Sequence, residues 1–261
     1  MQVAQAPIGV GRRDGLYVPA TGALLVAAGQ SLAGWSAVLG FLISAGGAAV
    51  LLVAGRRKSR RDRFVLLTLV VAFTLAATPV ALACPLFAPV LVVAMWPSLR
   101  RQPGFPLAKV LIIGGLVAIP CVIVVFAWWV NQPSIVFYSF LPEWVVSSMP
   151  IFVPIALCGI AAALNSTWEE LLWRRVLADK MPSKRGLSRV ASVIVLSILF
   201  GLAHRHSLPG GVAGVVMTGA FAVVAHILVL TLRRGILAAL IAHFIADFVL
   251  LLLITFGPTY G

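Results

Sequence analysis

Long apolar runs constrain the fold of this chain more than any other feature. Residues 17–55, 64–98 and 107–130 are almost free of charged side chains, and about 20 consecutive apolar residues suffice for a helix to cross a bilayer. Overall, 61% of the residues are hydrophobic and only 10% are charged, whereas soluble domains carry about 25% charged residues. The sequence excludes a soluble globular protein and predicts an all-α, polytopic transmembrane helical bundle.

Breaks within the runs, together with the helices expected further along the chain, give about eight spans in all. Residues 17–55 are interrupted around Gly29 and residues 64–98 at Cys84-Pro85, and each run is long enough for two short spans. We interpret each as a tight hairpin, followed by a single span at 107–130 and an external loop at 131–148. Four further helices are expected at about 150–180, from 188, from 211 to 232 and from 235 to 256.

Basic residues gather in the short connections between the apolar runs. The net charge is +13, from 20 Lys and Arg against 7 Asp and Glu, which in a soluble chain would indicate nucleic acid as the partner. Here the positive-inside rule explains it, because Lys and Arg in short loops keep those loops in the cytoplasm. The sequence therefore predicts an integral membrane protein, typical of a bacterial cytoplasmic membrane, with no nucleic-acid partner. The loops expected to be cytoplasmic are 56–63, 100–101, 174–189 and 233–234.

Ionisable side chains are concentrated in the last helices. Such groups are costly in the hydrocarbon region and generally face a polar interior where they have a function. We therefore expect the functional site within residues 150–256. The ionisable side chains in this region include all four histidines and four of the seven acidic residues: His204, His206, His226, His243, Glu169, Glu170, Asp179 and Asp247.

One helix in this region carries two adjacent acids with different expected surroundings. Glu170 and Arg174 are four residues apart, so they share a helix face and can form an ion pair. Glu169 points about 100° away from that face and is left free. Glu169 is therefore the candidate for chemistry, and the Glu170–Arg174 pair is the candidate for a structural contact.

Two histidines and one more acid are placed to join Glu169. His243 and Asp247 are one helical turn apart on a common face. Counted from the basic helix ends, Glu169, His204 and His243 lie roughly 13–24 Å below the same face of the membrane. This spacing permits the groups to meet in a cavity among the last four helices that opens towards the cytoplasm.

Three motifs on successive helices carry a family resemblance. The order Glu-Glu-x-x-x-Arg, Phe-x-x-x-His and His-x-x-x-Asp resembles the CPBP family (Abi, or CAAX-protease and bacteriocin-processing proteins) of intramembrane proteases. The run Leu-Ala-Ala-Leu-Ile-Ala-His-Phe around the third motif also fits. The resemblance covers residues 150–256, which it implies are a catalytic core, and leaves 1–149 as variable N-terminal transmembrane helices. It implies an endopeptidase that cleaves a membrane-associated peptide or protein.

The resemblance also implies a role for each motif residue. Glu169 resembles the catalytic glutamate that activates water, and His204 resembles its partner. His243 and the residue at 247 resemble the pair that supports the oxyanion or completes the site. The family's structural ion pair corresponds to Glu170 and Arg174.

Two positions depart from the family pattern. The family often has Gly where this chain has Arg175, which adds a charge near the site entrance. It often has Asn where this chain has Asp247, and an ionised carboxylate cannot donate a hydrogen bond to an oxyanion. We interpret Asp247 as orienting His243, with a metal-ligand role as the alternative.

The sequence leaves the metal dependence of the site open. Glu169, His204, His243 and Asp247 are all of types that coordinate Zn²⁺, and the family carries a metalloprotease label. The same side chains can equally form a metal-free site in which a glutamate activates water.

Two functions of other classes compete with the protease. A non-catalytic family member could act as a bacteriocin-immunity or scaffold membrane protein, and loss of a motif residue would have favoured it, but none is lost. A proton- or cation-coupled transporter would use the same buried acids and histidines. The chain shows no internal repeat of the kind that marks many secondary transporters, which disfavours that reading.

Overall fold

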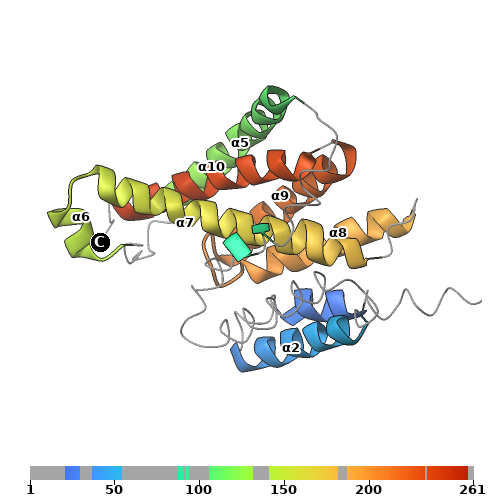
Figure 1. The fold of residues 1–261 in the computed structure, drawn as a ribbon. Helices are drawn as coiled ribbons and strands as arrows, with labels where there is room; N and C mark the ends of the chain where they lie inside the picture. Colours follow the sequence, from blue (N-terminus) through green and yellow to red (C-terminus); the bar gives the residue numbers. More distant parts are fainter. Residues whose placement is uncertain are drawn as a thin grey trace, which may run out of the picture.

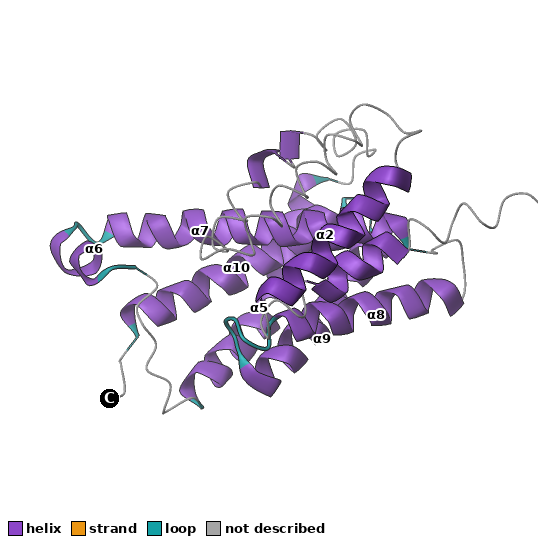
Figure 2. Cartoon of the chain, turned by 90° about the horizontal axis from the view of Figure 1, so that it is seen from below, coloured by secondary structure: helices purple, strands orange, loops and turns teal. Residues whose placement is uncertain are grey.

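Every regular element in the described part of the chain is a helix (Figures 1 and 2), which agrees with the predicted all-α class. The predicted break at Cys84-Pro85 and the basic loops 56–63 and 100–101 lie outside the described residues. The computed structural model describes residues 21–29, 37–54, 88–90, 92–93, 106–131, 141–181, 187–232 and 234–257. Its helices include α2 (Ala37–Ala54), α5 (Leu107–Val130), α6 (Glu143–Ser148), α7 (Phe152–Leu171), α8 (Leu187–Ala203), α9 (Gly211–Thr231) and α10 (Gly235–Phe256).

Four helical segments of the described chain are long and apolar enough to cross a membrane. Shorter apolar helices occur at Leu42–Leu51 and Ser188–Ala203. These helices support an integral membrane protein. They number fewer than the predicted eight or so spans, and residues 55–87, where part of the prediction falls, are outside the description. The four segments are Leu107–Val130, Phe152–Leu177, Gly211–Thr231 and Gly235–Phe256.

The predicted helix at 150–180 is continuous but not uniformly α-helical. After α7 the chain forms a π-helical segment, η2 (Leu172–Leu177), and a 3₁₀ turn, η3 (Ala178–Lys180). π-Helical turns inside α-helices are rare overall, but those that occur are often found at functional sites. This change of helix type follows directly after Glu169 and Glu170 and includes Arg174.

The predicted loop at 131–148 contains a short helix. Pro142 precedes α6 and Glu143 occupies its first turn. Proline is suited to a helix start, and a carboxylate near the first turn is stabilised by the helix dipole. These local signals explain the helix within a segment that was predicted as irregular.

Helix α10 is the centre of the bundle. It packs against α5, α7 and α9, while α8 packs on α9 (Figure 1). Two close approaches require glycine: a Cβ at Gly114 would lie 2.9 Å from the Ala238 carbonyl oxygen, and one at Gly201 would lie 2.5 Å from that of Val215. Close helix contact through small residues is typical of membrane bundles.

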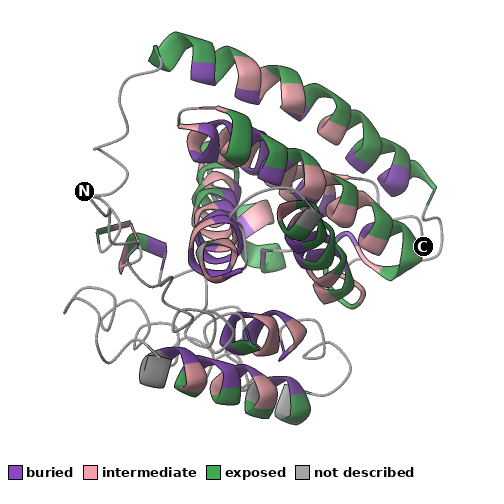
Figure 3. Ribbon diagram, turned by 90° about the vertical axis from the view of Figure 1, so that its right-hand side faces the viewer, coloured by how far each residue is buried: buried purple, intermediate pink, exposed green. Residues whose placement is uncertain are grey.

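The outward faces of the helices are exposed (Figure 3), and many of the large side chains on them are apolar. On α5, Ile112, Ile119 and Ile123 are each more than half exposed, at 60%, 56% and 61%. A water-soluble protein rarely presents so large an apolar surface. In a membrane protein this surface faces lipid, so polar side chains in the interior of the bundle are enclosed by apolar helices.

Candidate active site

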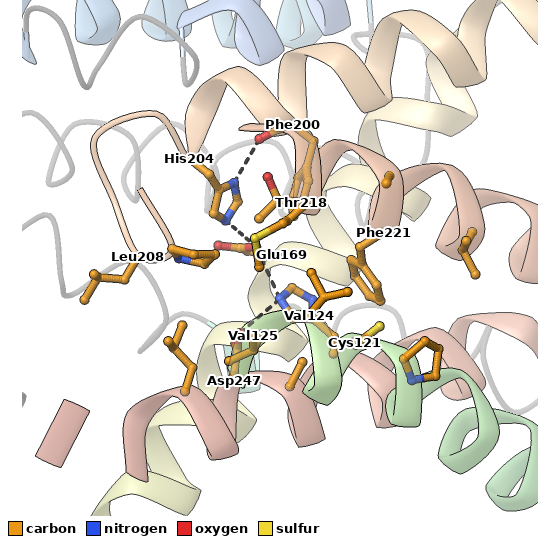
Figure 4. Close-up of a pocket in the computed structure, with 18 of the residues that line it drawn as sticks. Cys121, Val124, Val125, Glu169, Phe200, His204, Leu208, Thr218, Phe221 and Asp247 are labelled. Atoms are coloured by element: carbon orange, nitrogen blue, oxygen red, sulfur yellow. Dashed lines mark hydrogen bonds and ion pairs between the residues drawn. The ribbon is translucent and has the colours of Figure 1, made fainter. Parts of the chain in front are cut away.

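Glu169, His204 and His243 meet inside the bundle, although they come from three different helical segments. The Glu169 Oε2 atom lies 3.7 Å from His204 Nε2 and 3.7 Å from His243 Nε2. Glu169 comes from the last turns of α7, His204 directly follows α8, and His243 lies in α10. Figure 4 shows Glu169 reaching towards His204, with Asp247 on the opposite side. The structure thus brings together the three groups whose depths were counted from the sequence.

The Glu169 side chain is partly buried, and its buried Oε2 atom is not held by a hydrogen bond among the described residues. Its side chain is 17% exposed, and Oε2 has no hydrogen-bond partner in the described part of the chain. The two 3.7 Å distances exceed the usual hydrogen-bond range of about 2.7–3.2 Å. Glu169 is therefore placed to share a proton or a water molecule with either imidazole.

His204 is held in one orientation by its own helix turn. Its Nδ1 lies 2.9 Å from the carbonyl oxygen of Phe200. Because a carbonyl only accepts, Nδ1 carries the hydrogen and donates it, which turns Nε2 towards Glu169. The Phe200 ring packs against the imidazole with a centroid separation of 4.6 Å. Phe200 therefore supports His204 both through its backbone and through its ring.

His243 is held by Glu170, a contact that the sequence did not indicate. The His243 Nδ1 atom lies 2.9 Å from Glu170 Oε1, and Glu170 Oε2 lies 3.3 Å from Arg174 Nε. Glu170 and Arg174 form the predicted ion pair and have fully buried side chains. The predicted structural pair thus also orients one of the two histidines that face Glu169.

Asp247 approaches the other nitrogen of His243. Its Oδ1 lies 3.5 Å from His243 Nε2, while its Oδ2 accepts a hydrogen bond of 3.0 Å from Asn165 Nδ2. Asp247 therefore approaches Nε2 of His243, whereas Nδ1 is held by Glu170, and the orienting role inferred for Asp247 from the sequence stays a prediction. Asn165 precedes Glu169 by one turn of α7, and this shared face was the only sequence signal for its place here.

Arg174 is a cation enclosed by aromatic rings. Its guanidinium carbon lies 4.4 Å from the Phe200 ring centroid and 5.7 Å from that of Phe221. A guanidinium over an aromatic face is attracted electrostatically, more strongly when it is desolvated. The same two rings also contact His204 and His243, so Arg174 and the two site histidines share one packed aromatic setting.

A cavity of about 560 Å³ opens beside these groups. Its polar side includes Asn165, Glu169, His204, His243 and Asp247. Its opposite wall is largely apolar and comes from α5, α9 and residues 207–209, including Pro120, Cys121, Val124, Phe221 and Leu208 (Figure 4). Helix α5 packs mainly on α10 and only lightly on α9. One wall of the cavity thus comes from α5, which lies outside residues 150–256. No motif in the sequence indicated that this helix contributes to the site.

The two other histidines differ in burial, and the described residues form no cluster that could hold a metal ion. His226 is buried in α9, and His206 is exposed in the turn after α8. In the part of the chain that the structure describes, no three His, Cys, Asp or Glu side chains are arranged to hold a metal ion. The zinc alternative therefore has no geometric support among these residues.

The helices and the site together define an integral membrane protein with a carboxylate–imidazole centre buried in its helical bundle. Residues 149–249 match the family described as type II CAAX prenyl endopeptidase Rce1-like. This match confirms the resemblance to the CPBP/CAAX-protease family that the three motifs indicate for this part of the chain. No curated protein and no solved structure matches the chain.

Proposed function

We propose that this protein is an intramembrane endopeptidase of the CAAX-protease type that cleaves a membrane-associated peptide or protein. The main support is the Glu169 Oε2 atom, buried between the Nε2 atoms of two oriented histidines. An ionisable group in the interior of a membrane bundle is energetically costly and generally has a function. The family match supports the same activity at family level.

In the proposed first step, Glu169 activates a water molecule held between it and His204. The carboxylate takes one proton from the water while the water oxygen attacks the carbonyl carbon of the scissile peptide bond. The attack converts the carbonyl oxygen to an oxyanion. The proton on Glu169 then passes to the leaving amine as the C–N bond breaks, which restores the carboxylate.

His243 is proposed as the donor to the oxyanion. Its Nδ1–H is committed to Glu170, so the donor must be a proton on Nε2, the nitrogen that faces Glu169 and Asp247. A preorganised donor aimed at the developing charge is worth about 10²–10³ in rate. Asp247 lies beside this proton and is proposed to hold it in place, while Asn165 holds Asp247.

The cavity suggests how the chain is divided between chemistry and binding. We propose residues 150–256 as the catalytic core, and residues 1–149 as variable transmembrane helices that contribute at least one wall. Because α5 forms part of the apolar wall, an apolar part of the substrate would lie against it while the scissile bond faces Glu169. Lipid-embedded or lipid-attached peptides have this mixture of apolar and polar parts.

The function is tested with purified protein in liposomes and reporter peptides that end in a CAAX sequence, with the cysteine either prenylated or free. We expect cleavage of at least one reporter, with the new terminus identified by mass spectrometry. Parallel reactions with a chelator, and metal analysis of the protein, test the zinc alternative. Biological activity that survives in a Glu169→Gln variant would instead favour the immunity or scaffold role.

The basic loops are proposed to lie on the cytoplasmic side. Single cysteines introduced into 56–63, at the exposed Ser188 of the 174–189 segment, or into 233–234, in a chain lacking Cys84, Cys121 and Cys158, are expected to react with a membrane-impermeant maleimide only from the cytoplasmic side. Inverted and right-side-out vesicles give the two measurements. Labelling of any one segment from outside would contradict the common depth of Glu169, His204 and His243.

Asp247 is expected to tolerate replacement by Asn but not by Leu. In Asp247→Asn the amide can still face His243 Nε2 and bond to Asn165, so we expect a loss of cleavage rate of about tenfold or less. Asp247→Leu removes both contacts and should lose about 10²-fold or more. Initial rates on the same reporter measure the difference.

A paired exchange controls for the contact with Asn165. The double variant Asn165→Asp/Asp247→Asn retains one amide and one carboxylate at this pair, so it should fold like the wild type. An Asp247→Asn variant that is fully inactive and has lost bound zinc would overturn the proposed holding role and restore the metal-ligand alternative.

A further inference from the structure

His226 is a buried histidine that the proposed reaction does not use. It lies in α9, its residue is 3% exposed, and its Nδ1 lies 2.8 Å from the Ala222 carbonyl oxygen. Because that oxygen only accepts, Nδ1 donates and Nε2 of the neutral ring carries a lone pair. Nε2 is buried and has no hydrogen-bond partner among the described residues. His226 therefore presents an unpaired acceptor to the protein interior.

Arg174 presents the complementary donors. Its Nε faces Glu170, and its guanidinium carbon lies over the rings of Phe200 and Phe221. The two terminal nitrogens, Nη1 and Nη2, are buried without a hydrogen-bond partner in the described part of the chain. A guanidinium has donors only, so this end of Arg174 requires an acceptor.

The acceptor and the donors lie on elements that pack together. Segment η2, which carries Arg174, packs against α9, which carries His226, and the three nitrogen atoms are all buried without a partner among the described residues. No direct hydrogen bond joins them, but buried polar groups are generally paired directly or through an ordered water. We propose that His226 Nε2 and the Arg174 fork bind one bridging water, and that His226 is a positioning residue for the active site.

The consequence is a continuous polar chain across four helical segments, α9, η2, α7 and α10. It runs from His226 in α9 through the water to Arg174, then to Glu170, and ends at His243 Nδ1. Each member fixes the next, so His226 sets the direction in which His243 Nε2 points. This role rests on the proposed function, because it matters for catalysis only if His243 serves the oxyanion.

His226→Leu should lower kcat about tenfold with KM nearly unchanged, a loss typical of removing an outer partner of a reacting group. KM should hold because His226 is not among the described residues that line the cavity. His226→Gln retains an acceptor and should recover kcat to within about threefold of the wild type. In a Glu170→Gln background, His226→Leu should add little further loss, because the chain is already broken.

A second readout does not depend on cleavage. In ¹⁵N spectra of histidine-labelled protein, His226→Leu should shift the His243 resonances, whereas the matched control His206→Leu, at an exposed histidine, should not. Unchanged His243 resonances together with unchanged kcat would overturn the proposal, and so would losses that simply add in the double variant. If the wild type cleaves nothing but the resonances still shift, the polar chain stands and the proposed function fails.

Discussion

Replacement of Glu169 by Gln is expected to abolish cleavage, with a loss of about 10³-fold or more, while the yield of folded protein stays near that of the wild type. The amide cannot accept a proton from water, and general-base catalysis alone contributes about 10²–10⁴-fold. The substitution costs little stability because Oε2 makes no hydrogen bond with the described residues. Initial cleavage rates and the monodisperse fraction in size-exclusion chromatography measure the two quantities.

The matched control is Glu143→Gln, which makes the same chemical change at an exposed position in α6. It should leave both rate and yield unchanged. Cleavage by Glu169→Gln within tenfold of the wild-type rate would contradict the proposed base. Ion flux into liposomes that is lost in Glu169→Gln, with no cleavage by the wild type, would instead support the transporter.

The spacing of residues along the helices indicated which groups could meet at the centre of the site, but not that they do. The helix periodicity left Glu169 off the face of the Glu170–Arg174 pair, and the distances from the basic helix ends placed it level with His204 and His243. Both inferences use only the rise and rotation of a helix. The structure agrees, with Glu169 Oε2 at 3.7 Å from each Nε2 atom.

The sequence was not sufficient to predict how the histidines are held. His243 touches both Glu169 and Glu170, although adjacent residues point in different directions on a helix. The contact is possible because the two nitrogens of one imidazole ring face different ways. Which nitrogen meets which carboxylate depends on the rotation of α10 against α7, and no periodicity within either helix reports that rotation.

The apolar wall from α5 was missed for a different reason. Its residues are ordinary for a membrane span, and only packing against α10 distinguishes those near the site from those facing lipid. An apolar pattern identifies a span, but it carries little information on which face meets a neighbouring helix. The N-terminal part of the chain therefore contributes to the site without carrying a motif.

Replacement of Glu170 by Ala is expected to reduce the yield of folded protein sharply and to abolish cleavage in what remains. Arg174 is 1% exposed, and removal of one partner of a buried ion pair costs about 3–5 kcal/mol because the other charge is left uncompensated. The same change takes the acceptor from His243 Nδ1. Folded yield and thermal unfolding report the first effect, and the rate per folded molecule reports the second.

A double variant separates these two effects. In Glu170→Leu/Arg174→Leu both charges are replaced by apolar groups, a change that is often neutral for stability, so the folded yield should recover. Cleavage should not recover, because His243 still lacks its Nδ1 partner and its Nε2 is no longer directed at the reacting carbonyl. Recovery of both yield and rate in the double variant would show that Glu170 only neutralises Arg174. A separate comparison of the single variants Glu170→Ala and Glu169→Ala tests the buried pair: equal folded yields would show that the pair contributes no stability. The expected division between a stabilising charge pair and an orienting hydrogen bond follows from the two oxygens of one carboxylate, since Oε2 faces Arg174 and Oε1 faces His243.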